Sequence, residues 1–169
     1  MGLDVTAYSG LSRVDNPDLD EYGDPVEWRT MWLAHPEKID VTERNWPGRS
    51  KGIEPGAVYL FSEKVVFRAG SYMGYNSWRN SLAILAGYLD DTYVWERVSS
   101  GPFVELIHFS DCEGIIGPVV AEKLAGDFAE YQSKVDQAPD NHIDGFHRLY
   151  ADFRRAFELA RDNGAVDFH

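Results

Sequence analysis

Hydrophobic and polar residues alternate in several short stretches of the chain, and this two-residue period predicts β-strands. Residues 3–8 show it most simply, with apolar odd positions and largely polar even ones: Leu3, Val5 and Ala7 against Asp4, Thr6 and Tyr8. Further strands are predicted over residues 26–33, 57–61, 65–68 and 103–109, with a hairpin turn at 62–64. The last five residues, 165–169, alternate as well and are able to add a strand.

A different spacing, with apolar residues three and four positions apart, predicts helices. The first begins after a cap at Asn76 or Ser77, and its apolar stripe is Trp78, Leu82, Leu85 and Leu89. The second begins at Pro118, because proline is favoured at the first helical position. The third spans about residues 141–163, and Gly164 stands where a C-terminal glycine cap belongs.

The order of these elements indicates a single α+β domain over residues 1–169. Most strands come first, then one helix, one strand and two long C-terminal helices, which favours an antiparallel or mixed sheet with about three helices. Residues 34–56 are rich in proline and glycine and are predicted to be a long irregular loop. Such loops are uncommon in compact domains, so this one is either a functional lid or contains short elements.

Charge and cysteine content narrow the possible partners. The formal net charge of -12 argues against direct nucleic-acid binding, which needs clustered Lys and Arg. It is consistent either with solubility alone or with an acidic face that docks on a basic protein. Cys112 is the single cysteine, which fits a reducing cytoplasm. No apolar run approaches the ~20 residues of a membrane span, and no signal peptide is recognisable, so a cytoplasmic protein without a membrane partner is expected.

Residues 70–79 have the composition of a pocket wall. Gly70 and Gly74 allow the backbone to approach a ligand, and aromatic rings beside a cation suit a flat, anionic molecule. Trp78 is assigned to the helix core instead. The predicted ligand-binding residues are Ser71, Tyr72, Tyr75, Asn76 and Arg79. The alternative is that these side chains serve packing alone.

Residues 108–114 form a second candidate site, because loops that follow strands often carry function. Its candidate catalytic residues are His108, Asp111, Cys112 and Glu113. A thiol needs a nearby base such as histidine to act as a nucleophile. The alternative is a small buried cysteine in a turn whose acids bond backbone amides. No metal-binding motif with ligand spacing is present, and no metal or cofactor is expected.

The C-terminal stretch offers a third set of polar side chains. Asp167 and His169 alternate with Val166 and Phe168. If this stretch docks on the sheet, it can bring both polar residues to the same site as Asp111. The alternative is a frayed terminus.

Four phrases of the sequence carry a resemblance: MGLDVTAY, AGSYMGYNSWRNSLA, HFSDCEGIIGPVVAEKLAGDFAEYQ and DNGAVDFH. Together they resemble a family of small bacteriophage and prophage proteins. The resemblance covers about half of the chain and implies an intracellular, phage-related setting. It assigns no activity, cofactor or catalytic residue.

Three hypotheses follow. The first is an intracellular, phage-type binding protein with a polar-aromatic pocket for a small anionic, nucleotide-like ligand, with phage–host conflict as its setting. The second is an acidic inhibitor that docks on a host enzyme. The third is a small hydrolase or transferase that uses Cys112 or Asp111 with His108.

Overall fold

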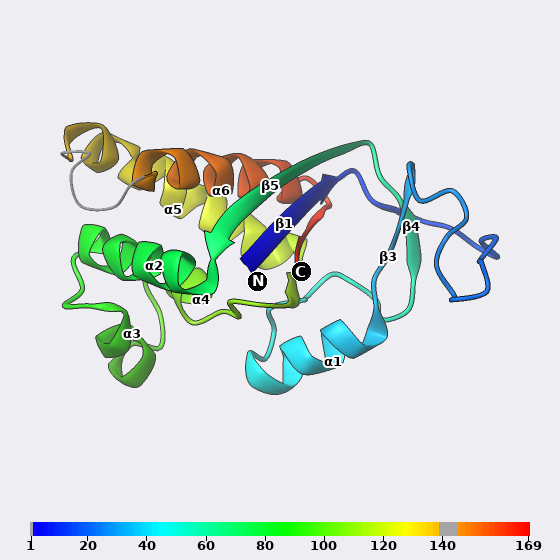
Figure 1. Ribbon diagram of the computed structural model, residues 1–169, viewed down its shortest axis with the longest axis horizontal. Helices are drawn as coiled ribbons and strands as arrows, with labels where there is room; N and C mark the ends of the chain where they lie inside the picture. Colours follow the sequence, from blue (N-terminus) through cyan, green and yellow to red (C-terminus); the bar gives the residue numbers. More distant parts are fainter. Residues whose placement is uncertain (1, 139–144) are drawn as a thin grey trace.

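The first and last strands of the chain lie side by side in the middle of one antiparallel sheet (Figure 1). The computed structural model describes residues 2–138 and 145–169. In it, β1 (Gly2–Ser9) pairs with β5 (Glu63–Ser71) on one side and with β7 (Ala165–Phe168) on the other. The outer neighbour of β7 is β6 (Gly114–Ile116). We call this four-stranded sheet, of order β5-β1-β7-β6, the central sheet.

A smaller sheet continues from the far end of β1. Its order is β2-β4-β3, formed by β2 (Ser12–Arg13), β4 (Val58–Leu60) and β3 (Met31–Leu33). The described helices are α1 (Pro36–Asn45), α2 (Tyr72–Ala86), α3 (Asp91–Arg97), α4 (Val104–Ile107), α5 (Pro118–Gln137) and α6 (Phe146–Ala160). Helices and antiparallel sheets thus combine in one α+β fold, as predicted. Within the described residues, no helix has the length and apolar character to cross a membrane.

The alternation predicted for residues 3–8 is confirmed, and it separates the two faces of the central sheet. Leu3, Val5 and Ala7 are fully buried with Val166 and Phe168 of β7, in a core that α5 and α6 cover. Figure 1 shows α5 and α6 on this side of the sheet and α1 on the other. We call these the helix face and the polar face. The C-terminal stretch is therefore docked as a central strand.

The hairpin predicted at residues 62–64 is wrong. The two strands exist, but β4 belongs to the small sheet and β5 pairs with β1 of the central sheet. Ser62 donates its backbone N–H to Ser9 at 2.9 Å, so the chain passes between sheets at this point. Turn residues flanked by apolar runs indicate a change of direction but do not identify the pairing partner.

The strand predicted over residues 103–109 is also wrong, because the segment contains the short helix α4. Hydrophobic residues on all faces of this helix and its ends are buried: Phe103, Val104, Leu106, Ile107 and Phe109. A short apolar run of this kind is compatible with a buried strand or a buried helix. The strand of this region is β6, which lies after the 108–114 turn instead of before it.

The helix predictions are largely confirmed, and α2 starts earlier than expected. Helix α5 begins at Pro118, and α5 and α6 are the long C-terminal pair. The predicted start of the last helix near 141 lies outside the described residues, and α6 begins at Phe146. Helix α2 begins at Tyr72 because Ser71, not Asn76, is its N-cap and accepts the N–H of Gly74. The stretch 34–56, predicted to be irregular, contains α1, which starts with proline and buries Ile39 and Thr42.

Candidate functional site

All four phrases that carry the sequence resemblance contribute to the central sheet or its edges. The first phrase supplies Gly2–Tyr8 of β1, AGSYMGYNSWRNSLA covers the end of β5 and most of α2, and DNGAVDFH contains β7. The third phrase contains the 108–114 turn and β6. The strand order therefore brings together segments that are far apart in the sequence, and their polar side chains meet at one end of the sheet.

A row of polar side chains crosses the polar face at this end. Asp4 of β1 pairs in register with Arg68 of β5. On its other side, Asp4 exchanges two backbone hydrogen bonds with His169, of 2.8 and 2.9 Å. The ladder between β6 and β7 ends at Gly114 and Phe168, and continuing its antiparallel register by one residue places Glu113 beside His169. We call Arg68, Asp4, His169 and Glu113 the polar row, and all four side chains reach solvent at least in part.

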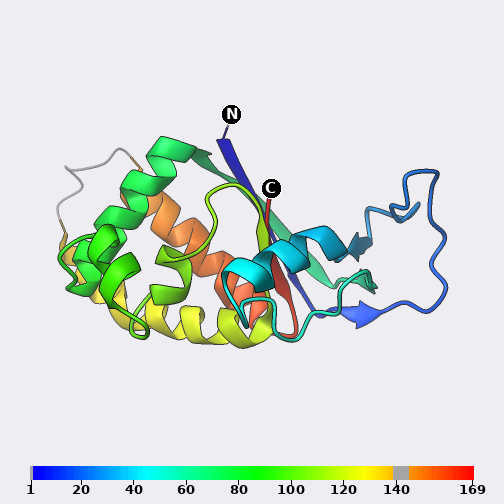
Figure 2. The ribbon, with the colours of Figure 1, turned by 90° about the horizontal axis from the view of Figure 1, so that it is seen from below.

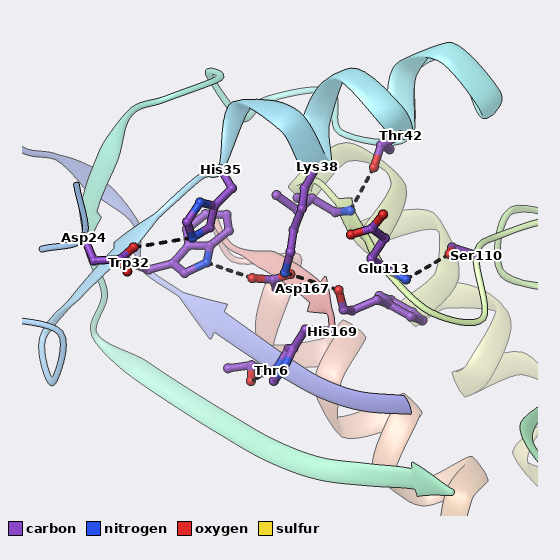
Figure 3. A network of polar contacts seen from close by, with 12 residues as sticks. Thr6, Asp24, Trp32, His35, Lys38, Thr42, Ser110, Glu113, Asp167 and His169 are labelled. Atoms are coloured by element: carbon purple, nitrogen blue, oxygen red, sulfur yellow. Dashed lines mark hydrogen bonds and ion pairs between the residues drawn. The ribbon is translucent and has the colours of Figure 1, made fainter. Parts of the chain in front are cut away.

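The ring of His169 is held in place by a neighbour on β1. Thr6 Oγ1 lies 3.0 Å from His169 Nε2, and the tautomer of the ring decides which of the two donates. Thr6 is only 6% exposed, so its hydroxyl has a fixed position against the histidine ring, whereas the histidine itself is exposed to solvent (Figure 3). The imidazole is thus oriented before any ligand arrives.

At the β5 end of the row, Arg68 is oriented by Asp4. Its Nη1 donates to both carboxylate oxygens of Asp4, at 3.1 and 2.9 Å. The arginine side chain is 59% exposed. A guanidinium has five N–H donors, so a group bound through Nη1 still has donors to offer to an anion. Helix α2 begins four residues later, at the same end of the sheet, since Ser71 pairs with Gly2.

A buried ion pair lies on the same face, between the central sheet and its cover. Asp167 accepts hydrogen bonds from Lys38 Nζ at 2.7 Å and from Trp32 Nε1 at 3.1 Å. Tyr8 stacks on Trp32 with ring centroids 5.0 Å apart. Burial, and then the negative charge of Asp167, raise the pKa of the Tyr8 hydroxyl above its ordinary value. These contacts fasten α1 and β3 to β7 and leave the β1–β5 half of the face uncovered.

The predicted pocket wall at 70–79 is divided between the core and the surface. Tyr75 is fully buried, and its ring stacks on Trp78 with centroids 5.9 Å apart. Arg79 is 6% exposed; it donates to the carbonyls of Ile107, at 3.2 Å, and Phe109, and to Asn76 Oδ1. Arg79 therefore holds the chain around α4 from within. Tyr75 Oη and Arg79 Nε have no hydrogen-bond partner among the described residues.

The two predicted turns do lie against each other. Asn76 Nδ2 donates to Asp111 Oδ2 at 2.9 Å, and Arg79 reaches the carbonyl of Phe109. Ser71 is exposed at the start of α2, and Tyr72 is half-buried against the core. The structure thus brings Ser71, Asn76 and Asp111 to the end of the sheet where the polar row lies, and it places Tyr75 and Arg79 beneath them.

The candidate catalytic residues separate in a similar way. His108 Nε2 lies 2.7 Å from the carbonyl oxygen of Val94, and its ring packs on Trp95, so this histidine is engaged with α3. Cys112 and Glu113 are exposed.

Ser110 shapes their turn, because its Oγ accepts the N–H groups of Cys112 at 3.2 Å and Glu113 at 3.0 Å. The histidine next to Glu113 is therefore His169, on the neighbouring strand, and not His108. Figure 3 shows Ser110 and Glu113 together on their turn and His169 beside Thr6.

Sequence reasoning missed Asp4, Thr6 and Arg68 as site residues. Their signal was present, because Asp4 and Thr6 are the polar members of an alternating strand, as Asp167 and His169 are in the last one. What was missing was the pairing of the two strands, which joins the two polar sets.

Groups of three or more His, Cys, Asp or Glu side chains arranged to hold a metal ion are not found in the described part of the chain. Comparison with protein-family models, with curated proteins and with solved structures finds no match for this chain. The chemistry of the site therefore rests on its own residues.

Proposed function

We propose that the protein binds a small anionic ligand of the nucleotide class at the polar row. The observation that carries this proposal is the cross-strand register that aligns Arg68, Asp4, His169 and Glu113 on the uncovered end of the polar face. The row has a cationic end at β5 and an acidic end at β6. A ligand with an anionic group and several hydroxyl groups matches that polarity.

The β5 end suits the anionic group of such a ligand. Arg68 offers N–H donors to phosphate or carboxylate oxygens, and charge-assisted bonds of this kind are among the strongest in proteins. The N-terminus of α2, at the same end of the sheet, carries a partial positive charge. The first turn of this helix contains no acidic side chain to cancel it.

The β6 end suits hydroxyl groups. Glu113 and Asp111 are acceptors, and the amide of Asn76 holds Asp111 at 2.9 Å. The imidazole of His169, held by Thr6, can accept or donate at the middle of the row. Ribose hydroxyls donate to carboxylates in just this manner in other nucleotide sites.

The resemblance to phage and prophage proteins supplies the context of the proposal. We expect the binding to occur in the cytoplasm of a host cell, where the single thiol of Cys112 stays reduced. A role in phage–host conflict would follow if the ligand is a nucleotide that the host uses as a signal or a precursor.

Titration calorimetry with a panel of nucleoside mono-, di- and triphosphates tests the proposal. Arg68→Gln should weaken binding about 10-fold or more, because a charge-assisted bond to the ligand is lost. Arg148→Gln is the matched control: Arg148 is 60% exposed and pairs with Asp152 at 2.8 Å, much as Arg68 pairs with Asp4.

The control should bind like the unaltered protein. The proposal fails if no member of the panel binds, or if Arg68→Gln and Arg148→Gln weaken binding equally. Substitutions at Tyr75 and Arg79 are less informative, since both side chains are buried and their loss would disturb the fold.

A further inference from the structure

A loop projects from the end of the molecule opposite the polar row, and it carries a second candidate binding surface. Residues 15–27 extend beyond the small sheet and away from the helices, as Figures 1 and 2 both show. We call this segment the acidic loop. It contains no Lys or Arg, and its acidic residues, all exposed, are Asp15, Asp18, Asp20, Glu21, Asp24 and Glu27.

Hydrogen bonds within the acidic loop give it a defined shape. Leu19 and Pro25 form an antiparallel bridge, and Val26 N–H donates to the carbonyl of Asp18 at 3.0 Å. The carboxylate of Asp20 accepts the N–H groups of Tyr22 at 2.8 Å and Asp24 at 3.0 Å. A loop organised in this way loses little conformational entropy when a partner binds.

Apolar side chains on this loop are presented to water. Tyr22 is 83% exposed, Val26 is 53% exposed and Leu19 is 49% exposed. Single exposed apolar residues are ordinary, but several on one short projecting loop are characteristic of interaction surfaces. Tyrosine is moreover among the residues that contribute most to binding energy at protein interfaces.

A groove lies where the acidic loop joins the body. Its volume is about 550 Å³. Asp15, Pro17 and Leu19 line it from the loop, and Leu33 and Val58 line it from the small sheet. Arg13, at its edge, is paired with Glu54 at 2.7 Å. The groove therefore combines apolar side chains with a few polar ones, Asp15 among them, and the charge of Arg13 is offset by Glu54. Such a lining suits a long apolar side chain or the aliphatic stem of an arginine.

We propose that the acidic loop is a docking surface for a cationic, amphipathic segment of a partner protein. Lys and Arg side chains of that segment contact the exposed carboxylates, and its apolar side chains pack on Tyr22 and enter the groove. The sign of the charge decides the class of partner, because nucleic acids and anionic membranes would be repelled. This surface is distinct from the polar row, which lies at the other end of β1.

Fluorescence anisotropy with the full chain tests the proposal. The probe is a labelled synthetic peptide of about twelve residues in which arginines and leucines are interspersed, and a second peptide has serine in place of leucine. The arginine–leucine peptide should bind saturably, and its affinity should fall as salt is raised because exposed charges are screened. The arginine–serine peptide should bind at least about 10-fold more weakly, because it lacks the apolar contacts.

Matched variants locate the contact. Glu21→Gln with Glu27→Gln should weaken binding by about 3- to 10-fold, and Tyr22→Ser by about 10-fold. The control, Glu122→Gln with Glu130→Gln, removes the same charge from exposed positions of α5 and should leave affinity within about 2-fold.

Three results would overturn the proposal: no saturable binding of the arginine–leucine peptide, equal weakening in the two double variants, or full affinity in Tyr22→Ser. None of these outcomes depends on whether nucleotides bind at the polar row.

Discussion

The two faces of the central sheet are built from the same strands, yet one face forms the core and the other presents polar side chains to solvent. On the helix face, Val5 and Val166 are fully buried, whereas on the polar face Asp4 is 40% exposed at its side chain. The difference arises because successive side chains of a strand point to opposite faces. Substitutions one position apart should therefore act in different ways: on stability at the helix face, and on recognition at the polar face.

The largest loss of stability is expected at the centre of the helix face. The ring of Phe153 lies 5.0 Å from that of Phe67 and 4.9 Å from that of Trp78, measured between centroids. Phe153→Ala should lower the free energy of unfolding by about 3–5 kcal/mol, because it removes buried apolar area and leaves a cavity. Denaturant-induced unfolding, followed by tryptophan fluorescence, measures the change.

Val66 gives the control on the other face. It lies on β5 and is 61% exposed. Val66→Ala should change the free energy of unfolding by no more than about 0.5 kcal/mol, as at other surface positions. Equal losses in Phe153→Ala and Val66→Ala would show that the two faces do not differ as described.

The next largest effect is expected at the covered part of the polar face. Asp167→Asn leaves Lys38, which is 19% exposed, without its carboxylate partner. Removal of one member of a buried ion pair costs about 3–5 kcal/mol, and the residual exposure of Lys38 reduces our expectation to about 2 kcal/mol. Unfolding in urea measures it. Asp152→Asn, in the exposed pair with Arg148, should cost less than about 0.5 kcal/mol, and a similar cost at both sites would contradict the description.

These two expectations rest on the spacing of apolar and polar residues within single strands and helices, which is the part of the fold that the sequence predicts well. The burial of Leu3, Val5 and Ala7 follows from their spacing, and the start of α5 follows from Pro118. Both signals are local, since each depends only on residues that are a few positions apart in the sequence. Local signals also predicted that residues 165–169 could form a strand.

Long-range pairing could not be predicted in this way. Arg68 and Asp4 meet although they are 64 residues apart along the chain. The sequence predicts a strand within β5, but the intervening turn wrongly indicates β4 as its partner. The polar row depends wholly on the correct pairing of β1, so its members appeared in the sequence as separate polar residues. Likewise, the burial of Arg79 depends on carbonyl groups of the chain around α4, which no local pattern reveals.

A smaller, pH-dependent effect is expected in the cover of the polar face. Glu43 of α1 accepts hydrogen bonds from the N–H groups of Gly48 at 2.6 Å and Ser50 at 2.8 Å, and from the Ser50 hydroxyl at 2.5 Å. Burial alone would raise the pKa of Glu43, but these hydrogen bonds and the nearby Arg49 outweigh it, so its pKa lies below the ordinary value.

Because the pKa of Glu43 is lower in the folded state, its ionised form contributes stability above the unfolded pKa, near 4.3. That contribution is lost as the pH falls through the folded pKa. Glu43→Gln should therefore cost about 1–2 kcal/mol at neutral pH, and the difference from the unaltered protein should shrink in acid. Unfolding curves at several pH values measure it. A difference that grows as the pH falls would contradict the assignment.

The smallest change in stability is expected where the largest change in binding is proposed. Arg68 and Asp4 are 59% and 40% exposed, and an exposed ion pair contributes only about 0.2–1 kcal/mol. Arg68→Gln should therefore unfold within about 1 kcal/mol of the unaltered protein while it loses nucleotide affinity. Unfolding and calorimetry on the same preparation, with Arg148→Gln beside it, separate the two quantities. If Arg68→Gln loses affinity and also several kcal/mol of stability, then the polar row supports the sheet, and its contrast with the helix face disappears.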